Sequence, residues 1–190
     1  MKLGVLVSGK GSNLRNLVER GFAVVAVATN RPSCGGAAFA RERGIPLGEF
    51  SQRSFASLDE RDAAMGAWLR ERGVELVVCA GYDRVLSAPL LQLFPERIVN
   101  IHPSLLPNFA GGMDAVERAL EAGVRYTGCT VHLVTSAVDG GPVLLQAGVP
   151  IEREDDVETL RARIQAEEHR ILPEAIRLLE RRVAPSAAQR

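Results

Sequence analysis

Two polar side chains with complementary chemistry, Asn100 and His102, stand at the end of a short apolar run. In an extended strand, residues two apart point to the same face, so the amide and the imidazole are expected to face one site. An amide donor and a side chain that titrates near neutral pH suit a carbonyl carbon that becomes tetrahedral. Pro103 follows directly and restricts the next loop. The pattern favours a catalytic over a structural role for His102.

A glycine-rich segment, SGKGSN at residues 8–13, lies between an apolar run at 3–7 and the start of an expected helix. Glycines at such a junction let backbone N–H groups turn toward a phosphate, and the helix dipole adds partial positive charge. The spacing of the glycines matches neither the dinucleotide-binding fingerprint nor a Walker motif. The segment therefore predicts a monophosphate site, and a bare strand-to-helix turn is the alternative.

The acid Asp139 begins an Asp-Gly-Gly-Pro sequence between two expected strands. Asp-Gly is common in turns, so a purely structural interpretation is available. Alternatively, the carboxylate reaches His102 and raises its pKa or orients its ring. The residues alone leave both interpretations open.

Neither the histidines nor the cysteines have the spacing of a metal site, and no metal is expected. His132 and His169 have no evident role in the sequence. Cys79 and Cys129 lie in apolar runs, where a buried thiol that acts as a small hydrophobic group is the better interpretation.

Apolar runs and amphipathic segments alternate over the first hundred residues. The expected strands are residues 3–7, 22–28, 74–80 and 97–101, and the expected helices are 13–20, 37–43, 57–72 and 87–94. Such alternation, with few polar interruptions in the strands, predicts a parallel sheet covered on both faces. After about residue 125, two strands at 129–134 and 143–151 flank a loop, and a long helix follows at 155–182.

The length of 190 residues suits one domain with a substantial core. We expect a single α/β domain over residues 1–184, with a mostly parallel sheet flanked by helices and a Rossmann-like N-terminal half. A disordered tail is expected at residues 185–190. Within the domain, Ser57 with Glu60 three residues later predicts a helix start, and Gly73 predicts its end.

The charges balance, with 23 basic and 23 acidic side chains, which argues against a nucleic-acid partner. No segment approaches the roughly 20 apolar residues of a membrane span, and the first residues do not form a signal peptide. We expect a cytoplasmic protein that binds small molecules, with no membrane partner, as a monomer or a homodimer.

Taken together, three segments resemble the phosphoribosylglycinamide formyltransferases: SGKGSNL at residues 8–14, NIHPSLLP at 100–107 and VDGGPVLLQAGVP at 138–150. The likeness extends from Gly4 to about Leu179. The Asn, His and Asp trio is shared among enzymes that use 10-formyltetrahydrofolate. The glycine-rich loop and the single-domain length narrow the resemblance to the enzymes of purine synthesis among them. It implies the formyltransferase fold and transfer of a formyl group from 10-formyltetrahydrofolate to the amine of glycinamide ribonucleotide in purine synthesis, without a metal.

The resemblance also implies a role for individual residues. Asn100, His102 and Asp139 match the catalytic trio. The residues implied in binding are Gly11, Ser12 and Asn13 for the substrate phosphate, Glu168 for its ribose, and Arg61, Asp83, Arg84, Val85 and Leu86, with Asn100, for the folate. The family usually has an apolar residue at the position of Asp83, so either the backbone binds there or the pocket differs.

The position of Glu168 has support that does not depend on the resemblance. Ile164 and Ile171 belong to an apolar stripe on the expected last helix, and Glu168 lies on that stripe. A carboxylate on a buried face needs hydrogen-bond partners, and ribose hydroxyls are suitable.

The implied mechanism is direct attack of the amine on the formyl carbon, with Asn100 and a protonated His102 stabilising the oxyanion. Asp139 would keep His102 charged and help to relay a proton. Hydrolysis of the formyl folate is the nearest alternative. Formylation of methionyl-tRNA would need a further domain and more positive charge. A folate- or nucleotide-binding protein without turnover, and a NAD-binding domain, are weaker alternatives.

Overall fold

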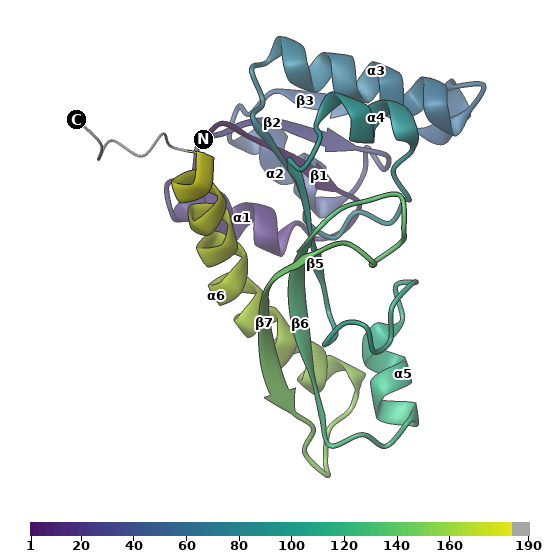
Figure 1. The fold of residues 1–190 in the computed structure, drawn as a ribbon, viewed down its shortest axis with the longest axis vertical. Coiled ribbons are helices and arrows are strands. Elements are labelled where there is room, and N and C mark those ends of the chain that lie inside the picture. The colour runs from purple at the N-terminus through teal and green to yellow at the C-terminus, as the bar shows by residue number, and fades with distance from the viewer. Residues whose placement is uncertain (184–190) are drawn as a thin grey trace.

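The computed structural model describes residues 1–183, so the tail expected at 185–190 lies outside the described residues. One sheet of seven strands forms the centre, in the order β3-β2-β1-β4-β5-β6-β7 (Figure 1). The strands are β1 (Leu3–Val7), β2 (Val24–Thr29), β3 (Leu47–Glu49), β4 (Leu76–Cys79), β5 (Ile98–His102), β6 (Tyr126–Leu133) and β7 (Val143–Pro150). Strands β1 to β5 pair in parallel, whereas β6 and β7 are antiparallel. The predicted α/β class with a mostly parallel sheet is confirmed.

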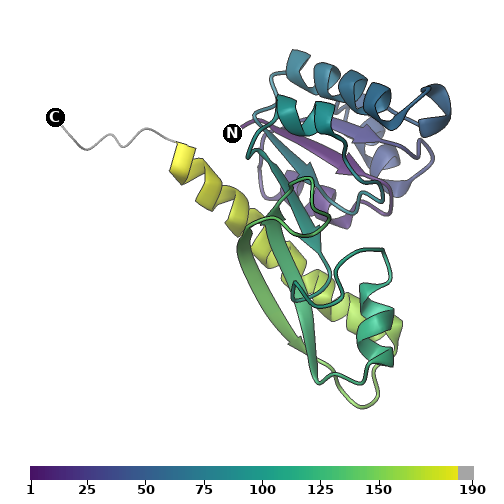
Figure 2. The ribbon, with the colours of Figure 1, turned by 45° about the vertical axis from the view of Figure 1, so that its right-hand side comes forward.

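Helices cover both faces of the sheet (Figures 1 and 2). They are α1 (Ser12–Glu19), α2 (Gly35–Glu42), α3 (Leu58–Glu71), α4 (Ala88–Leu93), α5 (Ala115–Glu121) and α6 (Val157–Val183), and a 3₁₀ turn η1 spans Gln52–Ser54. Side chains of β1 alternate between two cores, because residues of a strand point to opposite faces in turn. Leu3 and Val5 pack with α1, α2 and α6, and Leu6 packs with α3 and α4. Burial on both faces explains why this strand is apolar throughout.

The predicted start and end of α3 are confirmed in detail. The Ser57 hydroxyl accepts a hydrogen bond of 3.0 Å from the Glu60 N–H, and the Glu60 carboxylate accepts one of 2.9 Å from the Ala56 N–H. Gly73 follows the helix with a φ of 69°, a conformation that glycine adopts without strain.

The largest differences from the sequence prediction concern β3, α5 and β6. Strand β3 and helix α5 were not predicted, and β6 begins at Tyr126 instead of residue 129. The strand β3 has three residues and contains a glycine, and α5 has seven residues, so neither segment carries a clear periodic pattern.

The last helix, α6, continues through Pro173 without a break. Proline cannot donate to the carbonyl four residues earlier, which leaves the His169 carbonyl free. The Asn16 side chain donates a hydrogen bond of 2.8 Å to that carbonyl. This contact fixes the position of α6 against α1, whose first turn belongs to the site described next. Within residues 1–183, no helix has the length and apolar character needed to cross a bilayer.

Candidate active site

A cavity of about 390 Å³ lies beyond the carboxyl ends of the parallel strands β1, β4 and β5. The loops that follow these strands line it, together with β6, the loop before β7 and one face of α6. Ligands of open α/β sheets bind at this edge. The glycine-rich loop, the Asn100 and His102 pair and Asp139 therefore meet at one place.

In the implied catalytic trio, Asp139 lies within contact distance of both His102 and Asn100. The Nδ1 atom of His102 lies 3.4 Å from Asp139 Oδ2, and the Asn100 Nδ2 atom lies 3.5 Å from Asp139 Oδ1. Asp139 has a φ of 51°, which aspartate tolerates better than most residues, and its Oδ2 accepts a hydrogen bond of 2.8 Å from the Gly111 N–H. Asp139 thus forms part of a turn and also faces His102.

Burial and hydrogen bonds shift the pKa values of Asp139 and His102. The pKa of Asp139 is lowered from 3.8 to about 2, chiefly through a hydrogen bond with His132, with further contributions from the Gly111 N–H and His102. Burial lowers the pKa of His102 below its usual 6.5 and outweighs the opposing effects of Asp139 and the Phe109 carbonyl. Burial therefore disfavours the protonated His102 that the resemblance implies, whereas its two contacts, the Asp139 carboxylate and the Phe109 carbonyl, favour it. A neutral imidazole next to a carboxylate is suited to accept a proton.

A histidine that sequence reasoning left without a role, His132, belongs to the same cluster. Its Nε2 atom lies 3.2 Å from Asn100 Nδ2 and 3.5 Å from Asp139 Oδ1. Asn100 of β5 is the register partner of His132 on the antiparallel strand β6. The register between β5 and β6 places His132 beside Asn100, and that register could not be predicted from the sequence.

The residues implied in phosphate and ribose binding surround the N-terminus of α1. Gly11 caps this helix with a φ of 76° and no side-chain cap, and its first turn carries no acid. The Asn13 Nδ2 atom donates a hydrogen bond of 2.9 Å to Glu168 Oε2, and the buried Asn13 Oδ1 has no partner among the described residues. Gln165, which was not predicted, donates one of 2.7 Å to the Ser12 hydroxyl. The structure thus brings the predicted residues Gly11, Ser12, Asn13 and Glu168 together and places Gln165 beside them.

The carboxylate of Glu168 lies on the predicted stripe between the buried Ile164 and Ile171. Burial raises the pKa of Glu168, and the hydrogen bond from Asn13 opposes that rise without cancelling it. An acid at the edge of a cavity whose pKa is raised by burial is a candidate ligand-binding group.

The loop after β4 lines the other end of the cavity with Asp83, Arg84, Val85 and Leu86. The Asp83 carboxylate is occupied by an ion pair with Arg31 and a hydrogen bond of 2.8 Å from Asn30 Nδ2. Of the two alternatives for this position, the structure favours binding through the backbone of the loop.

The buried Arg61 does not line this cavity, although the resemblance implies that it binds folate. Its side chain is fully buried against the adjacent Asp62. It reaches the loop only from behind, through the Val85 carbonyl.

Comparisons with known proteins agree with this geometry. The profile of the formyl transferase family, described as "Formyl transferase", matches residues 1–176. The chain belongs to this family. It is 38% identical over 182 residues to the phosphoribosylglycinamide formyltransferase of Haemophilus influenzae, an alignment that covers 93% of this chain and 85% of that protein.

This formyl transferase is also similar to a longer multifunctional protein and to a solved structure. It is 42% identical over 185 residues to the trifunctional purine biosynthetic protein adenosine-3 of Gallus gallus, which covers 94% of this chain but only 18% of that protein. The crystal structure of glycinamide ribonucleotide transformylase 1 from Symbiobacterium toebii matches with a TM-score of 0.90 at 46% identity, over 94% of this chain and 87% of that one. The chain thus spans less than a fifth of the trifunctional protein and most of the Symbiobacterium toebii protein.

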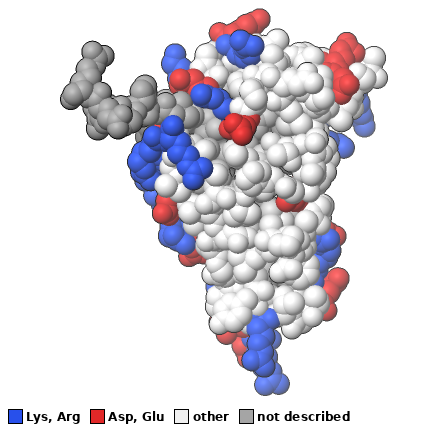
Figure 3. All heavy atoms as spheres, viewed as in Figure 1, with Lys and Arg blue, Asp and Glu red and all other residues white. Residues whose placement is uncertain are grey.

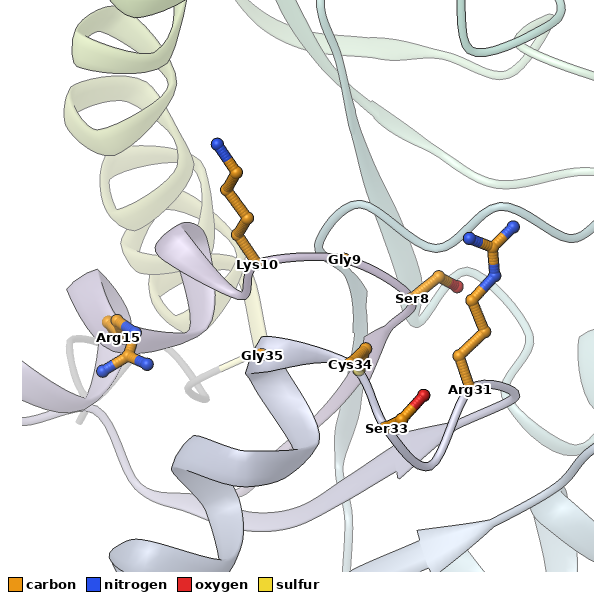
Figure 4. A pocket seen from close by; sticks show the side chains of 8 residues that line it. All are labelled: Ser8, Gly9, Lys10, Arg15, Arg31, Ser33, Cys34 and Gly35. Atoms are coloured by element: carbon orange, nitrogen blue, oxygen red, sulfur yellow. The ribbon is translucent and has the colours of Figure 1, made fainter.

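A second hollow of about 620 Å³ lies on the other side of the glycine-rich loop of this formyl transferase (Figure 4). Lys10, Arg15 and Arg31 line it, but their charged ends are well separated in Figure 4. Arg31 is paired with Asp83, and the Arg15 guanidinium lies over the Phe39 ring. These cations do not converge on one point, so the hollow does not form a defined anion site.

Other charged groups of the formyl transferase lie away from the cavity. Basic side chains gather at the left of Figure 3, over the end of α6, where Arg181 and Arg182 belong to the last turn. The cavity is lined by an earlier part of that helix, from Arg161 to Glu168. Among residues 1–183, no group of three or more His, Cys, Asp or Glu side chains is arranged to hold a metal ion.

Replacing Gly11 by alanine is expected to lower Tm by roughly 5–10 °C, because alanine is strained in the left-handed backbone conformation and its β-carbon would clash with a neighbouring residue. Gly11 has a φ of 76°, and a β-carbon there would lie 2.5 Å from the Gly36 Cα atom. Gly9 in the same loop is the matched control, since no atom lies within 4 Å of a β-carbon added to it. Thermal melts of both variants test this, and equal melting of the two would contradict it.

Proposed function

We propose that this formyl transferase moves the formyl group of 10-formyltetrahydrofolate to the amine of glycinamide ribonucleotide, giving N-formylglycinamide ribonucleotide and tetrahydrofolate. One observation carries the proposal. A single cavity joins a helix N-terminus without a side-chain cap and a half-buried acid at one end, the loop after β4 at the other, and Asn100, His102 and Asp139 between them. The names of the relatives from Haemophilus influenzae and Symbiobacterium toebii agree with this substrate.

The two ends of the cavity suit the two substrates. The N–H groups of Ser12 and Asn13 at the start of α1 bind the phosphate, because a helix N-terminus attracts anions. Glu168 accepts hydrogen bonds from the ribose hydroxyls. The backbone of Arg84, Val85 and Leu86 binds the folate.

The reaction is acyl transfer without a covalent enzyme intermediate. The amine nitrogen bonds to the formyl carbon, the oxyanion accepts a hydrogen bond from the Asn100 amide, and the C–N10 bond of the folate then breaks. His102 takes the proton that the amine loses, and Asp139 stabilises the imidazolium as it forms. The same proton is returned to N10, so no net proton is released.

We further propose that residues 1–184 form a formyltransferase domain. It acts in the cytoplasm on free small molecules, as a monomer or a homodimer. Sedimentation at working concentration distinguishes these two states.

The steady-state assay for this proposal follows tetrahydrofolate release while glycinamide ribonucleotide is varied at fixed 10-formyltetrahydrofolate. Saturable release that depends on the ribonucleotide is expected. Release at the same rate without it would indicate hydrolysis instead, and no release in either case would exclude turnover.

Changing Glu168 to glutamine is expected to raise KM for glycinamide ribonucleotide about 10- to 100-fold, because a charged acceptor for the ribose is lost. Glutamine keeps an oxygen for Asn13, whereas leucine would leave the Asn13 amide without its acceptor. Burial raises the pKa of Glu168, so its ionised form destabilises the free protein above that pKa and ceases to do so as pH falls through it. The variant should therefore melt no lower than the wild type at pH 7.

The matched control is Glu167→Gln, since Glu167 pairs with Arg170 outside the cavity. An unchanged KM for the ribonucleotide in Glu168→Gln would remove Glu168 from the binding site. A lower Tm together with normal substrate affinity would give it a structural role.

The dependence of kcat/KM on pH tests the role of His102 as a base. Activity is expected to fall as pH drops through the pKa of His102, which lies below the usual 6.5. Asp139 raises that pKa, so Asp139→Asn should move the acid limb of the residual activity to lower pH. The amine of the acceptor titrates alike in both proteins, so the difference between the profiles isolates the enzyme group. A limb that moves to higher pH would contradict this assignment.

A further inference from the structure

A buried ion pair lies behind the loop that lines the folate end of the cavity. Arg61 and Asp62 are neighbours near the start of α3, and both side chains have no exposed surface. The Arg61 Nη2 atom lies 2.6 Å from Asp62 Oδ1, and its Nε atom donates a hydrogen bond of 2.8 Å to the same oxygen. Gln52 Oε1 accepts a further hydrogen bond of 3.3 Å from Arg61 Nη1. The pair is therefore held in one orientation.

Both members of the pair also bind the backbone of the folate loop. Arg61 Nη2 donates a hydrogen bond of 3.3 Å to the Val85 carbonyl, and Asp62 Oδ2 accepts one of 2.6 Å from the Ser87 N–H. These two backbone groups lie on either side of Leu86, and the segment between β4 and α4 has no regular structure of its own. One donor and one acceptor from α3 thus replace the backbone pairing that a strand or helix would provide.

Stability alone does not account for charges at this position. Two buried ions lose their hydration, and apolar residues of similar volume often give a protein that is equally stable. The surroundings would accept such residues, because the fully buried Met65 and Leu90 belong to the same core. The shape of the loop is a better explanation, since apolar side chains could not bind the Val85 carbonyl and the Ser87 N–H.

The pair leaves the other side of the loop free. Within residues 1–183, the N–H groups of Arg84, Val85 and Leu86 donate no hydrogen bond to the protein, and all three residues line the cavity. A ligand that binds these groups depends on their positions. Since Arg61 and Asp62 fix the two flanking backbone groups, they also fix the spacing of these donors.

We propose that Arg61 and Asp62 are positioning residues for 10-formyltetrahydrofolate: they hold the loop at 83–87 in the shape that binds the folate and do not touch the folate themselves. This inference rests on the proposed function. It replaces the direct folate contact that the resemblance implies for Arg61.

The double variant Arg61→Met with Asp62→Leu tests the proposal, because it removes the contacts to the loop without leaving an unpaired buried charge. KM for 10-formyltetrahydrofolate is expected to rise about 10- to 100-fold. KM for glycinamide ribonucleotide should stay within about twofold, and Tm within a few degrees. The matched control is Arg163→Met with Asp155→Leu, since that ion pair lies outside the cavity. The control should leave both KM values unchanged.

If the double variant does not fold, Arg61→Lys decides the question, because lysine keeps a charge beside Asp62 but loses the planar fork that also reaches the Val85 carbonyl. A selective rise in KM for the folate is again expected, smaller than that of the double variant. A folded variant with normal KM for the folate would overturn the proposal, and so would equal losses for both substrates. Wild-type protein that fails to transfer the formyl group would contradict the proposed function instead, and the two failures are thus distinguishable.

Discussion

Replacing His102 by alanine is expected to lower kcat about 10³-fold, because the reaction then has no group to take the proton of the attacking amine. His102 is 5% exposed, and its two ring nitrogens face Asp139 Oδ2 at 3.4 Å and the Phe109 carbonyl at 3.1 Å. KM for each substrate should change much less than kcat, since neither substrate relies on His102 for its main contacts. Single-turnover kinetics at saturating substrate measure the effect.

His169 provides the matched control for this substitution. It is a second histidine whose pKa is lowered by burial, and it does not line the cavity. Its contact with Asn16 uses the backbone carbonyl, which His169→Ala retains. This control should keep kcat within about threefold. A His102→Ala protein with kcat within tenfold of the wild type would exclude His102 as the base.

Replacing Asp139 by asparagine is also expected to lower kcat about 10³-fold, because the imidazolium then forms without a neighbouring negative charge. Asparagine has the same shape and tolerates the φ of 51° found here, so the turn should persist. The change should also reduce stability, contrary to what the turn position alone suggests. The pKa of Asp139 is lowered to about 2, so its carboxylate stabilises the fold above the ordinary value of 3.8 and ceases to do so as pH falls toward 2. The loss at neutral pH is roughly 2 kcal/mol, or about 5 °C in Tm.

Asp156→Asn is the control, since Asp156 also has a lowered pKa but lies at the exposed start of α6. It should leave kcat unchanged. Melts of Asp139→Asn and the wild type should differ at pH 7 and converge near pH 2. A constant difference at both pH values, or a normal kcat, would show that the negative charge is not what Asp139 provides.

Much of the cavity could be predicted because its residues follow local rules. Asn100 and His102 share a face through the two-residue period of a strand, and the parallel sheet fixes the edge at which they lie. The resemblance implied Glu168, and the apolar stripe of a single helix supported it, because such a stripe depends only on the sequence of that helix. Asp139 could be proposed from its type but not assigned, because its partner is 37 positions away and only the fold brings them together.

The residues that were missed depend on contacts between distant elements. His132 reaches Asn100 through the antiparallel register of β5 and β6, and the start of β6 could not be located from the sequence. Gln165 reaches Ser12 only because α6 packs on α1, a contact that spans 153 positions. Arg61 illustrates the opposite case, since its alignment implies a ligand contact and the packing of α3 buries it behind the loop.

The fate of the formyl group tests the central claim most directly. Protein is mixed with 10-formyltetrahydrofolate that carries a labelled formyl carbon and with glycinamide ribonucleotide, and products are separated after one turnover. Transfer to the amine predicts one labelled formyl group in the ribonucleotide for each tetrahydrofolate released, with none released when the ribonucleotide is omitted. Label recovered as formate, or tetrahydrofolate released without the ribonucleotide, would contradict it.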